Sequence, residues 1–138
     1  MANTTPIFIL EPQTVSCTIN AANTARDGSG TLVTLFTAGA NNSRVDFVQF
    51  ISAQTTPAAN SAMVCRVFVT DTAGANPRLL SEVTLSSVTA SNTAVGASNT
   101  IFYSNGLLLS AGQQLKVSKS VHAGPEDTLQ VVARGGNY

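Results

Sequence analysis

Residues 27–53, DGSGTLVTLFTAGANNSRVDFVQFISA, alternate turn signals with runs that favour β-strands. Glycine adopts positive φ angles without steric cost, so the segments 27–30 and 38–42 are expected to be turns. The runs 31–37 and 44–53 are rich in threonine and in branched or aromatic residues, which fit a pleated sheet. This stretch therefore predicts two successive β-strands.

The same pattern continues on both sides of this stretch. Further strand-like runs cover residues 15–21, 63–70, 79–85, 100–103, 107–109, 114–121 and 128–134. No helix-length segment is predicted between them, which excludes parallel βαβ units. About eight short strands predict an all-β fold, an antiparallel β-sandwich that is jelly-roll-like. An immunoglobulin-like sandwich is the alternative, but the sequence has no tryptophan and no convincing cysteine pair.

Length and composition predict one β-sandwich domain over residues 1–138. Only 10% of the residues are charged, with seven basic and seven acidic side chains, whereas an average soluble domain has about 25%. Such a chain has little electrostatic protection against association. The basic residues are scattered singly, so nucleic acid is not an expected partner. No apolar run approaches the ~20 residues of a transmembrane helix, so no membrane partner is expected either.

The segment 1–14 is a possible N-terminal arm. Pro6 and Pro12 bracket four apolar residues, Ile7, Phe8, Ile9 and Leu10. Such a tetrapeptide can be an edge strand of its own domain or an arm that pairs with another chain. It is too short for the core of a signal peptide and has no basic residues before it, so we expect synthesis in the cytoplasm of the cell that makes it.

The sequence offers little catalytic chemistry. His122 is the only histidine, and no Gly-x-Ser-x-Gly motif accompanies it. The adjacent acids Glu126 and Asp127 have no nearby partners that would complete a metal site. Cys17 and Cys65 lie in apolar strand-like runs, where cysteine is usually a small buried residue, so we expect two free thiols. We expect no enzyme activity, no metal and no cofactor.

Two strand-like runs, 44–53 and 63–70, offer apolar residues to both faces. Because a two-sheet sandwich buries one face of each sheet, some of these residues are expected on an outer face. They are Val48 and Phe50, or Val64 and Phe68. Exposed patches of this kind mark interfaces and predict a homo-oligomer. Bulges or covering loops are the competing account. The candidate interface residues are Ile7, Phe8, Ile9, Leu10, Arg66, Phe68 and Tyr138.

Several turn segments resemble those of small virion proteins from tailed bacteriophages. These are residues 22–31, ANTARDGSGT, and residues 35–45, LFTAGANNSRV. Residues 78–82, RLLSE, resemble a mid-chain strand of those proteins. The ending 131–138, VVARGGNY, resembles their terminus, except that Asn137 stands where they have an acidic residue.

This resemblance implies a structural part of the virion with a jelly-roll-like fold. It implies a capsid decoration or cement protein that stabilises a phage head and that contacts both itself, as a trimer, and the major capsid protein. No catalytic role carries over to the matching residues. The alternative is a tail or fibre-tip module that binds a host surface receptor or glycan through the loops 55–61 and 86–99.

Overall fold

The computed structural model describes residues 9–54 and 58–138. Its eight strands are β1 (Glu11–Ile19), β2 (Val33–Thr37), β3 (Ser43–Ser52), β4 (Met63–Val69), β5 (Arg78–Leu85), β6 (Ser98–Leu109), β7 (Gln114–Lys119) and β8 (Leu129–Asn137). A short 3-10 helix, η1 (Pro125–Asp127), precedes β8. The prediction of an all-β fold with about eight strands is confirmed.

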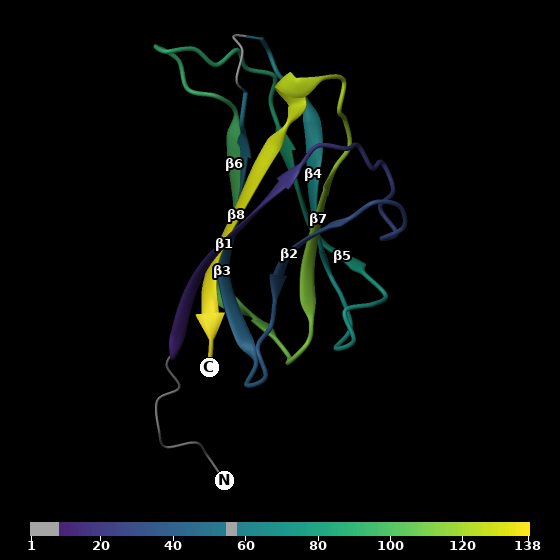
Figure 1. The fold of residues 1–138 in the computed structure, drawn as a ribbon, viewed down its shortest axis with the longest axis vertical. Helices are drawn as coiled ribbons and strands as arrows, with labels where there is room; N and C mark the ends of the chain where they lie inside the picture. Colours follow the sequence, from purple (N-terminus) through teal and green to yellow (C-terminus); the bar gives the residue numbers. More distant parts are fainter. Residues whose placement is uncertain (1–8, 55–57) are drawn as a thin grey trace.

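The strands form two four-stranded antiparallel sheets that pack as a sandwich (Figure 1). The first sheet has the order β1-β8-β3-β6, and the second has the order β2-β7-β4-β5. Except for β4 and β5, neighbouring strands within each sheet are not consecutive in the sequence. This strand order is that of a jelly roll, which consists of two interleaved Greek keys. The order differs from that of the immunoglobulin-like alternative.

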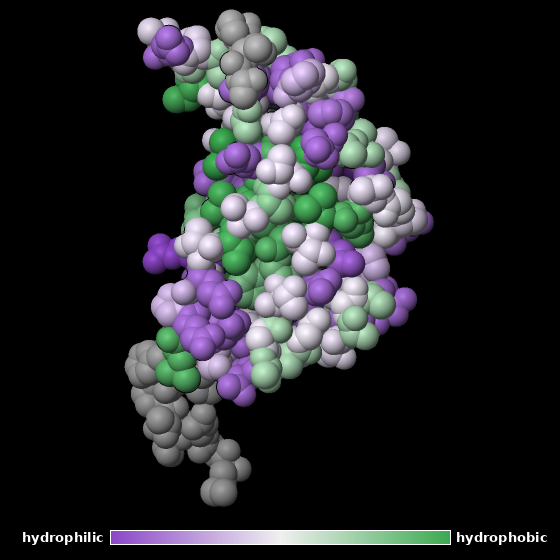
Figure 2. All heavy atoms as spheres, viewed as in Figure 1, coloured by the Kyte–Doolittle hydropathy of each residue, from purple (hydrophilic) through white to green (hydrophobic). Residues whose placement is uncertain are grey.

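The core lies between the sheets and is built from alternate residues of the strands. Figure 2 shows apolar side chains gathered in the middle of the view, between the β1 edge and the β2 edge of the sandwich. Half-buried Val15, Cys17 and Val33 of these edge strands pack against the core cluster. The largest fully buried apolar side chains are Phe50, Phe68, Leu85, Leu109, Leu115 and Leu129.

A β-bulge in β3 decides which of its residues face the core. The register of β3 with both β6 and β8 shifts between Val45 and Phe47, so Asp46 is an extra residue in the strand. Beyond the bulge the alternation is reversed, and Val48 and Phe50 are 0% exposed. Their expected position on an outer face is therefore wrong, and Phe47 lies on that face instead.

The expected outer face of β4 is covered by the chain itself. Phe68 is 0% exposed, although it does not belong to the main core cluster. Arg66 is 6% exposed and donates from Nε to Glu82 Oε1 (2.8 Å) and from a terminal nitrogen to the Asn23 carbonyl (3.2 Å). Asn23 belongs to the loop that joins β1 to β2, so this loop lies against the outer face of β4.

Further contacts fix the loop between β1 and β2 along the outer face of the second sheet. The backbone N–H of Asn23 donates to the carbonyl of Lys119 on β7 (2.8 Å). Arg26 pairs with Glu82 of β5 (2.7 Å), and Gly28 packs against Pro77, just before β5. Phe68 lies between these contacts and is 0% exposed, so its expected exposure on an outer face is wrong. Arg66 is ion-paired within its own chain, and a role of either residue in an interface stays a prediction.

The predicted strands 100–103 and 107–109 are one strand, β6. Asn105 and Gly106, which lie between the two predicted runs, belong to an irregularity within the strand. Its pairing with β3 passes directly from Phe102 to Leu107, so residues 103–106 lie opposite Asp46 alone. Gly106 has a φ of 73°, a conformation that favours glycine.

Both cysteines are free, which confirms their predicted state. Burial raises the pKa of Cys17 to about 11 and that of Cys65 to about 12. Because the thiolate is the reactive form, we expect slow modification of the native protein by a chromogenic disulfide reagent at pH 8. Two thiols should react at once in denaturant without reductant. Fewer than two would contradict the free state.

Candidate interaction surface

The outer face of the first sheet carries a group of apolar residues from three strands. We call this group the apolar strip, and it consists of Phe47, Ile51, Phe102, Leu108 and Val132. The strand registers place all five side chains on the face opposite the core. Phe102 is 74% exposed and Leu108 is 67% exposed, while the other three are half-buried. The strip is therefore open to a partner.

Two aromatic rings form the middle of the apolar strip. Phe47 of β3 and Phe102 of β6 are cross-strand neighbours, with ring centroids 6.0 Å apart and planes tilted by 55°. Such a tilted pair is a favourable aromatic arrangement. The pair places one ring on each of two neighbouring strands of the open face.

Few charges border the apolar strip. Arg44 donates to Asp46 (2.8 Å), and both side chains are partly exposed. Arg134 lies opposite Phe47 and is exposed, and it forms no ion pair with another described residue. The rest of the face presents neutral polar residues of β3, β6 and β8 (Gln49, Thr100 and Gln130) and small or neutral residues of β1, which are Pro12, Thr14, Ser16 and Thr18. Burial of apolar area, more than charge attraction, would therefore drive binding here.

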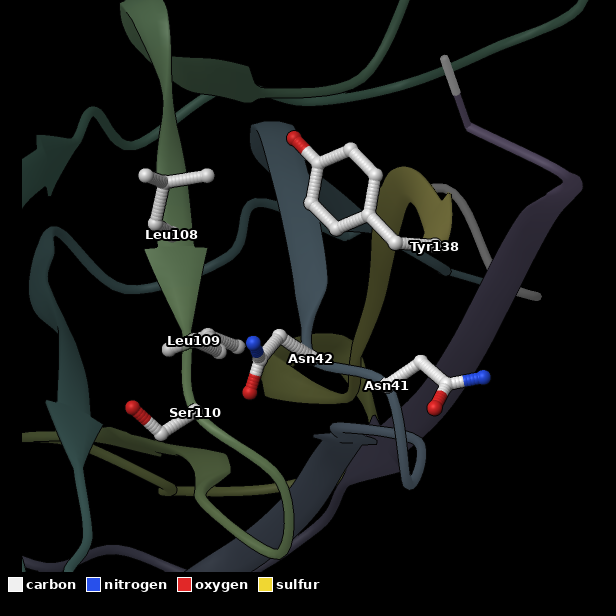
Figure 3. Close-up of a pocket in the computed structure, with 6 residues that line it drawn as sticks. All are labelled: Asn41, Asn42, Leu108, Leu109, Ser110 and Tyr138. Carbon is white, nitrogen blue, oxygen red and sulfur yellow. The ribbon is translucent and has the colours of Figure 1, made fainter. Parts of the chain in front are cut away.

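A pocket of about 500 Å³ adjoins the apolar strip at Leu108. We call it the terminal pocket, and its lining consists of Asn41, Asn42, Leu108, Leu109, Ser110 and Tyr138. Figure 3 shows Leu108 and Tyr138 on opposite sides of the pocket, Asn42 between them, and Asn41 pointing away. The backbone N–H of Tyr138 donates to the Asn42 carbonyl (3.3 Å), which holds the tyrosine beside the turn between β2 and β3.

The predicted interface residues fall into three groups. Leu10, 76% exposed, and half-buried Ile9 lie at the start of β1, at the same end of the sheet as Tyr138. Arg66 and Phe68 are buried beneath the loop between β1 and β2. Ile7 and Phe8 lie outside the described residues. Residues 11–14 of the possible arm belong to β1, where they pair with β8.

The sequence analysis missed the residues that dominate the apolar strip, Phe47, Phe102 and Leu108. The two-faced pattern of 44–53 did indicate an exposed apolar face, but the bulge at Asp46 reverses which residues occupy it. Phe102 and Leu108 were assigned to separate short strands, so their shared face was not visible.

A buried polar cluster is the second candidate site. It joins the end of β7 to η1 and to the residues before β4. Lys119 and Asp127 are both 0% exposed. The Asp127 carboxylate accepts hydrogen bonds from the backbone N–H groups of Ser61 and Ala123 (2.6 Å each) and from the Ser61 hydroxyl (3.0 Å). Lys119 donates to the Asp127 carbonyl and lies 3.0 Å from His122 Nδ1.

Burial and hydrogen bonding act on this cluster in opposite directions. Burial lowers the pKa of Lys119, because it penalises the charged ammonium, and the nearby Asp127 partly offsets this. For Asp127, burial alone would raise the pKa, but the hydrogen bonds from Ala123 and Ser61 hold it below its usual value. Since Lys119 and Asp127 are both 0% exposed, their interactions join the end of β7, η1 and the residues before β4 inside the fold.

The described residues offer few other sites. No group of three or more histidine, cysteine or acidic side chains among them could hold a metal ion. Within the same residues, no helix is long and apolar enough to cross a membrane.

Comparison with known proteins assigns no family. No family model matches the sequence, and no curated protein matches it. A chain from a structure of infectious bursal disease virus, Gt strain, is similar at 16% identity and a TM-score of 0.29. The match covers 92% of this chain and 31% of that chain, so this chain spans about a third of the viral one. This weak similarity to a viral protein does not establish a function.

Replacing Asp127 tests the buried cluster. Because its pKa is lowered in the folded state, Asp127 stabilises the fold above the unfolded pKa of about 4, and this stability is lost as the pH falls through the folded pKa. We expect Asp127→Asn to lower the free energy of unfolding at pH 7 by about 2–3 kcal/mol and to reduce the loss of stability on acidification. Urea denaturation at pH 7 and at pH 3 measures both.

The matched control is Asp46→Asn, which breaks a partly exposed ion pair. This substitution should lower the free energy of unfolding by less than about 1 kcal/mol. If both variants lower the free energy of unfolding equally, the buried cluster contributes no more stability than an exposed ion pair does.

Proposed function

We propose that this chain is a structural virion protein, a decoration or cement protein of a tailed-phage capsid, and that its role is mechanical and not catalytic. The observation that carries the proposal is the apolar strip. Phe102 and Leu108 are more than half exposed on the same face of the first sheet, and exposed apolar groups of this kind often mark a protein interface. The phage resemblance of the turn segments agrees with this role.

The low charge of the chain supports self-association. Only seven basic and seven acidic residues are present, and several are already occupied within the fold. Glu82 binds both Arg26 and Arg66, and Asp127 is buried. Little repulsion is left between copies that meet through the apolar strip.

We propose a closed homo-oligomer, a trimer, that also contacts the major capsid protein. The order of three rests on the phage resemblance. A closed oligomer that spans neighbouring capsid subunits binds through several contacts at once, so each contact can be weak while the total avidity is high. Removal of the apolar strips from water would then stabilise the head.

The receptor-binding alternative has one supporting feature. The loop between β5 and β6 carries Val95, which is 88% exposed, next to a tight turn closed by Ser91 and Ala94. However, Tyr103 packs against the core. Tyr138 is therefore the only tyrosine left for a glycan platform, and it lies at the terminal pocket, away from this loop.

Substitutions in the apolar strip test the proposal. We expect Phe102→Ser and Leu108→Ser each to weaken self-association at least about tenfold, because each removes apolar area from the contact. The matched control is Leu80→Ser on β5, since Leu80 is 36% exposed but belongs to the second sheet. Sedimentation velocity at micromolar concentrations gives the readout.

A wild-type protein that stays at the 14.2 kDa monomer mass would overturn self-association in solution. Cryo-electron microscopy of the assembled particle tests the location. Density for this chain on the head is expected, and density on the tail alone would overturn the decoration role.

A further inference from the structure

We propose that the connection between β7 and β8, residues 120–128, opens when His122 becomes protonated, so that acid loosens one end of the sandwich. This connection leads into the start of β8, whereas the terminal pocket lies at the end of that strand. The inference is independent of the proposed assembly role, because it concerns a contact inside a single chain.

The Lys119 ammonium has two close partners in this connection. It donates to the backbone carbonyl of Asp127, and its Nζ lies 3.0 Å from His122 Nδ1. An ammonium offers only donors, so a hydrogen bond to the ring requires a lone pair on Nδ1. That nitrogen has a lone pair only while the ring is neutral and carries its proton on Nε2. Protonation of the ring therefore removes the acceptor for Lys119.

The charged and titratable groups of the connection and of the strands beside it do not compensate a second positive charge. They are Lys119 on β7, Glu126 and Asp127 on η1, and Cys65 on β4, the cross-strand partner of Lys119. The ion pairs among the described residues do not include His122. A protonated ring would therefore face the ammonium without an acid at ion-pair distance.

Burial already disfavours the one cation of this cluster. Lys119 is 0% exposed, and its burial lowers the pKa of the ammonium, which the charge of Asp127 offsets only in part. A protonated His122 would bring a second cation to the 3.0 Å contact, where like charges repel. His122 is half-buried and lies outside the strands. Its ring can therefore move into water, and this movement opens the connection.

The closed connection holds residues of two other loops. The Asp127 carboxylate accepts hydrogen bonds from the N–H and the hydroxyl of Ser61, just before β4. Asn60, its neighbour in the chain, is 1% exposed and accepts a hydrogen bond from the N–H of Val88 (3.0 Å). Opening therefore releases the residues before β4 and, through Asn60, the start of the loop between β5 and β6.

The pH range of the effect can be assigned to one side chain. His122 is the only histidine of the chain, and histidine is the side chain that ordinarily changes charge between pH 5 and 8. Hydrogen bonds from Ala123 and Ser61 hold the pKa of Asp127 below its usual value, so this carboxylate stays charged throughout. A titration of Lys119 itself would persist in a variant without the histidine, and such a variant separates the two.

Hydrogen exchange resolved by NMR tests the opening at the amides of Ser61 and Ala123, which donate to Asp127. The wild type is compared with His122→Asn, whose side chain keeps an acceptor but cannot be protonated. Comparison at the same pH cancels the intrinsic pH dependence of exchange. We expect equal protection at pH 7.5, and about three- to tenfold lower protection in the wild type at pH 5.5, one unit below the ordinary histidine pKa of about 6.5.

The amides of Ala73 and Ala75 are the matched control. Both donate to the Asp71 carboxylate (3.0 and 2.8 Å), beyond the end of β4, whereas Ser61 precedes its start. Their exchange should be the same in the two proteins at both pH values. A pH-dependent difference at these amides would indicate loosening of the whole fold and would overturn a local opening.

Two further outcomes would contradict the proposal. Equal protection of Ser61 and Ala123 in both proteins at pH 5.5 would show that the ring does not control the connection. A loss at pH 5.5 that persists in His122→Asn would assign the effect to another group. The ring nitrogen chemical shifts of His122 give a second measurement that needs no variant. At pH 7.5 we expect a neutral ring with its proton on Nε2, and a ring with its proton on Nδ1 would overturn the inference.

Discussion

The extra residue in β3 is the constraint on which the outer surface of the molecule depends. β3 is an inner strand of the first sheet, and it pairs with β8 on one side and β6 on the other. Because side chains alternate along a strand, one added residue exchanges the two faces for the rest of the strand. Asp46 is that residue. Without it, Phe47 would point into the core and Val48 would point into water.

In the neighbouring strand β8, two glycines lie opposite the residues just before the bulge. Gly135 and Gly136 of β8 pair with Val45 and Arg44, just before the shift. A Cβ on Gly135 would collide with the carbonyl of Arg44, and one on Gly136 would collide with Ile9. The Gly-Gly pair therefore lets three chain segments approach one another at this end of the sheet. The same local geometry exposes Phe47, seats Ile9 and places Tyr138 at the terminal pocket.

In the second sheet, an outward-facing apolar residue is buried by a loop and not by a bulge. β4 keeps its apolar outer residue, Phe68, but the loop between β1 and β2 covers it. The buried Arg66 connects the loop to the sheet, since it donates hydrogen bonds both to Glu82 of β5 and to the Asn23 carbonyl of the loop. The second sheet is thus covered by its own chain, whereas the first sheet leaves Phe102 and Leu108 exposed.

Local sequence patterns were enough for the fold but not for the surface. Turn residues such as those at 27–30 and 38–42 act over a few positions, so strand number and class could be predicted from them. The faces of β3 depend on one inserted residue, and the burial of Phe68 depends on a loop more than 35 residues earlier in the sequence. The two-faced patterns of 44–53 and 63–70 left bulges or covering loops open as the competing account but did not decide for them. For this reason Phe102 and Leu108 were missed, while Phe68 was expected on an exposed face.

The pairing of β1 with β8 has a consequence for how the protein is made. The second strand in the order of the first sheet is supplied by residues 129–137, more than a hundred positions after β1. A chain that is still being synthesised therefore lacks the strand that links β1 to β3, and folding that depends on such distant contacts is slow. The open face of the first sheet is therefore complete only once β8, which contributes Val132 and Arg134 to it, has joined the sheet.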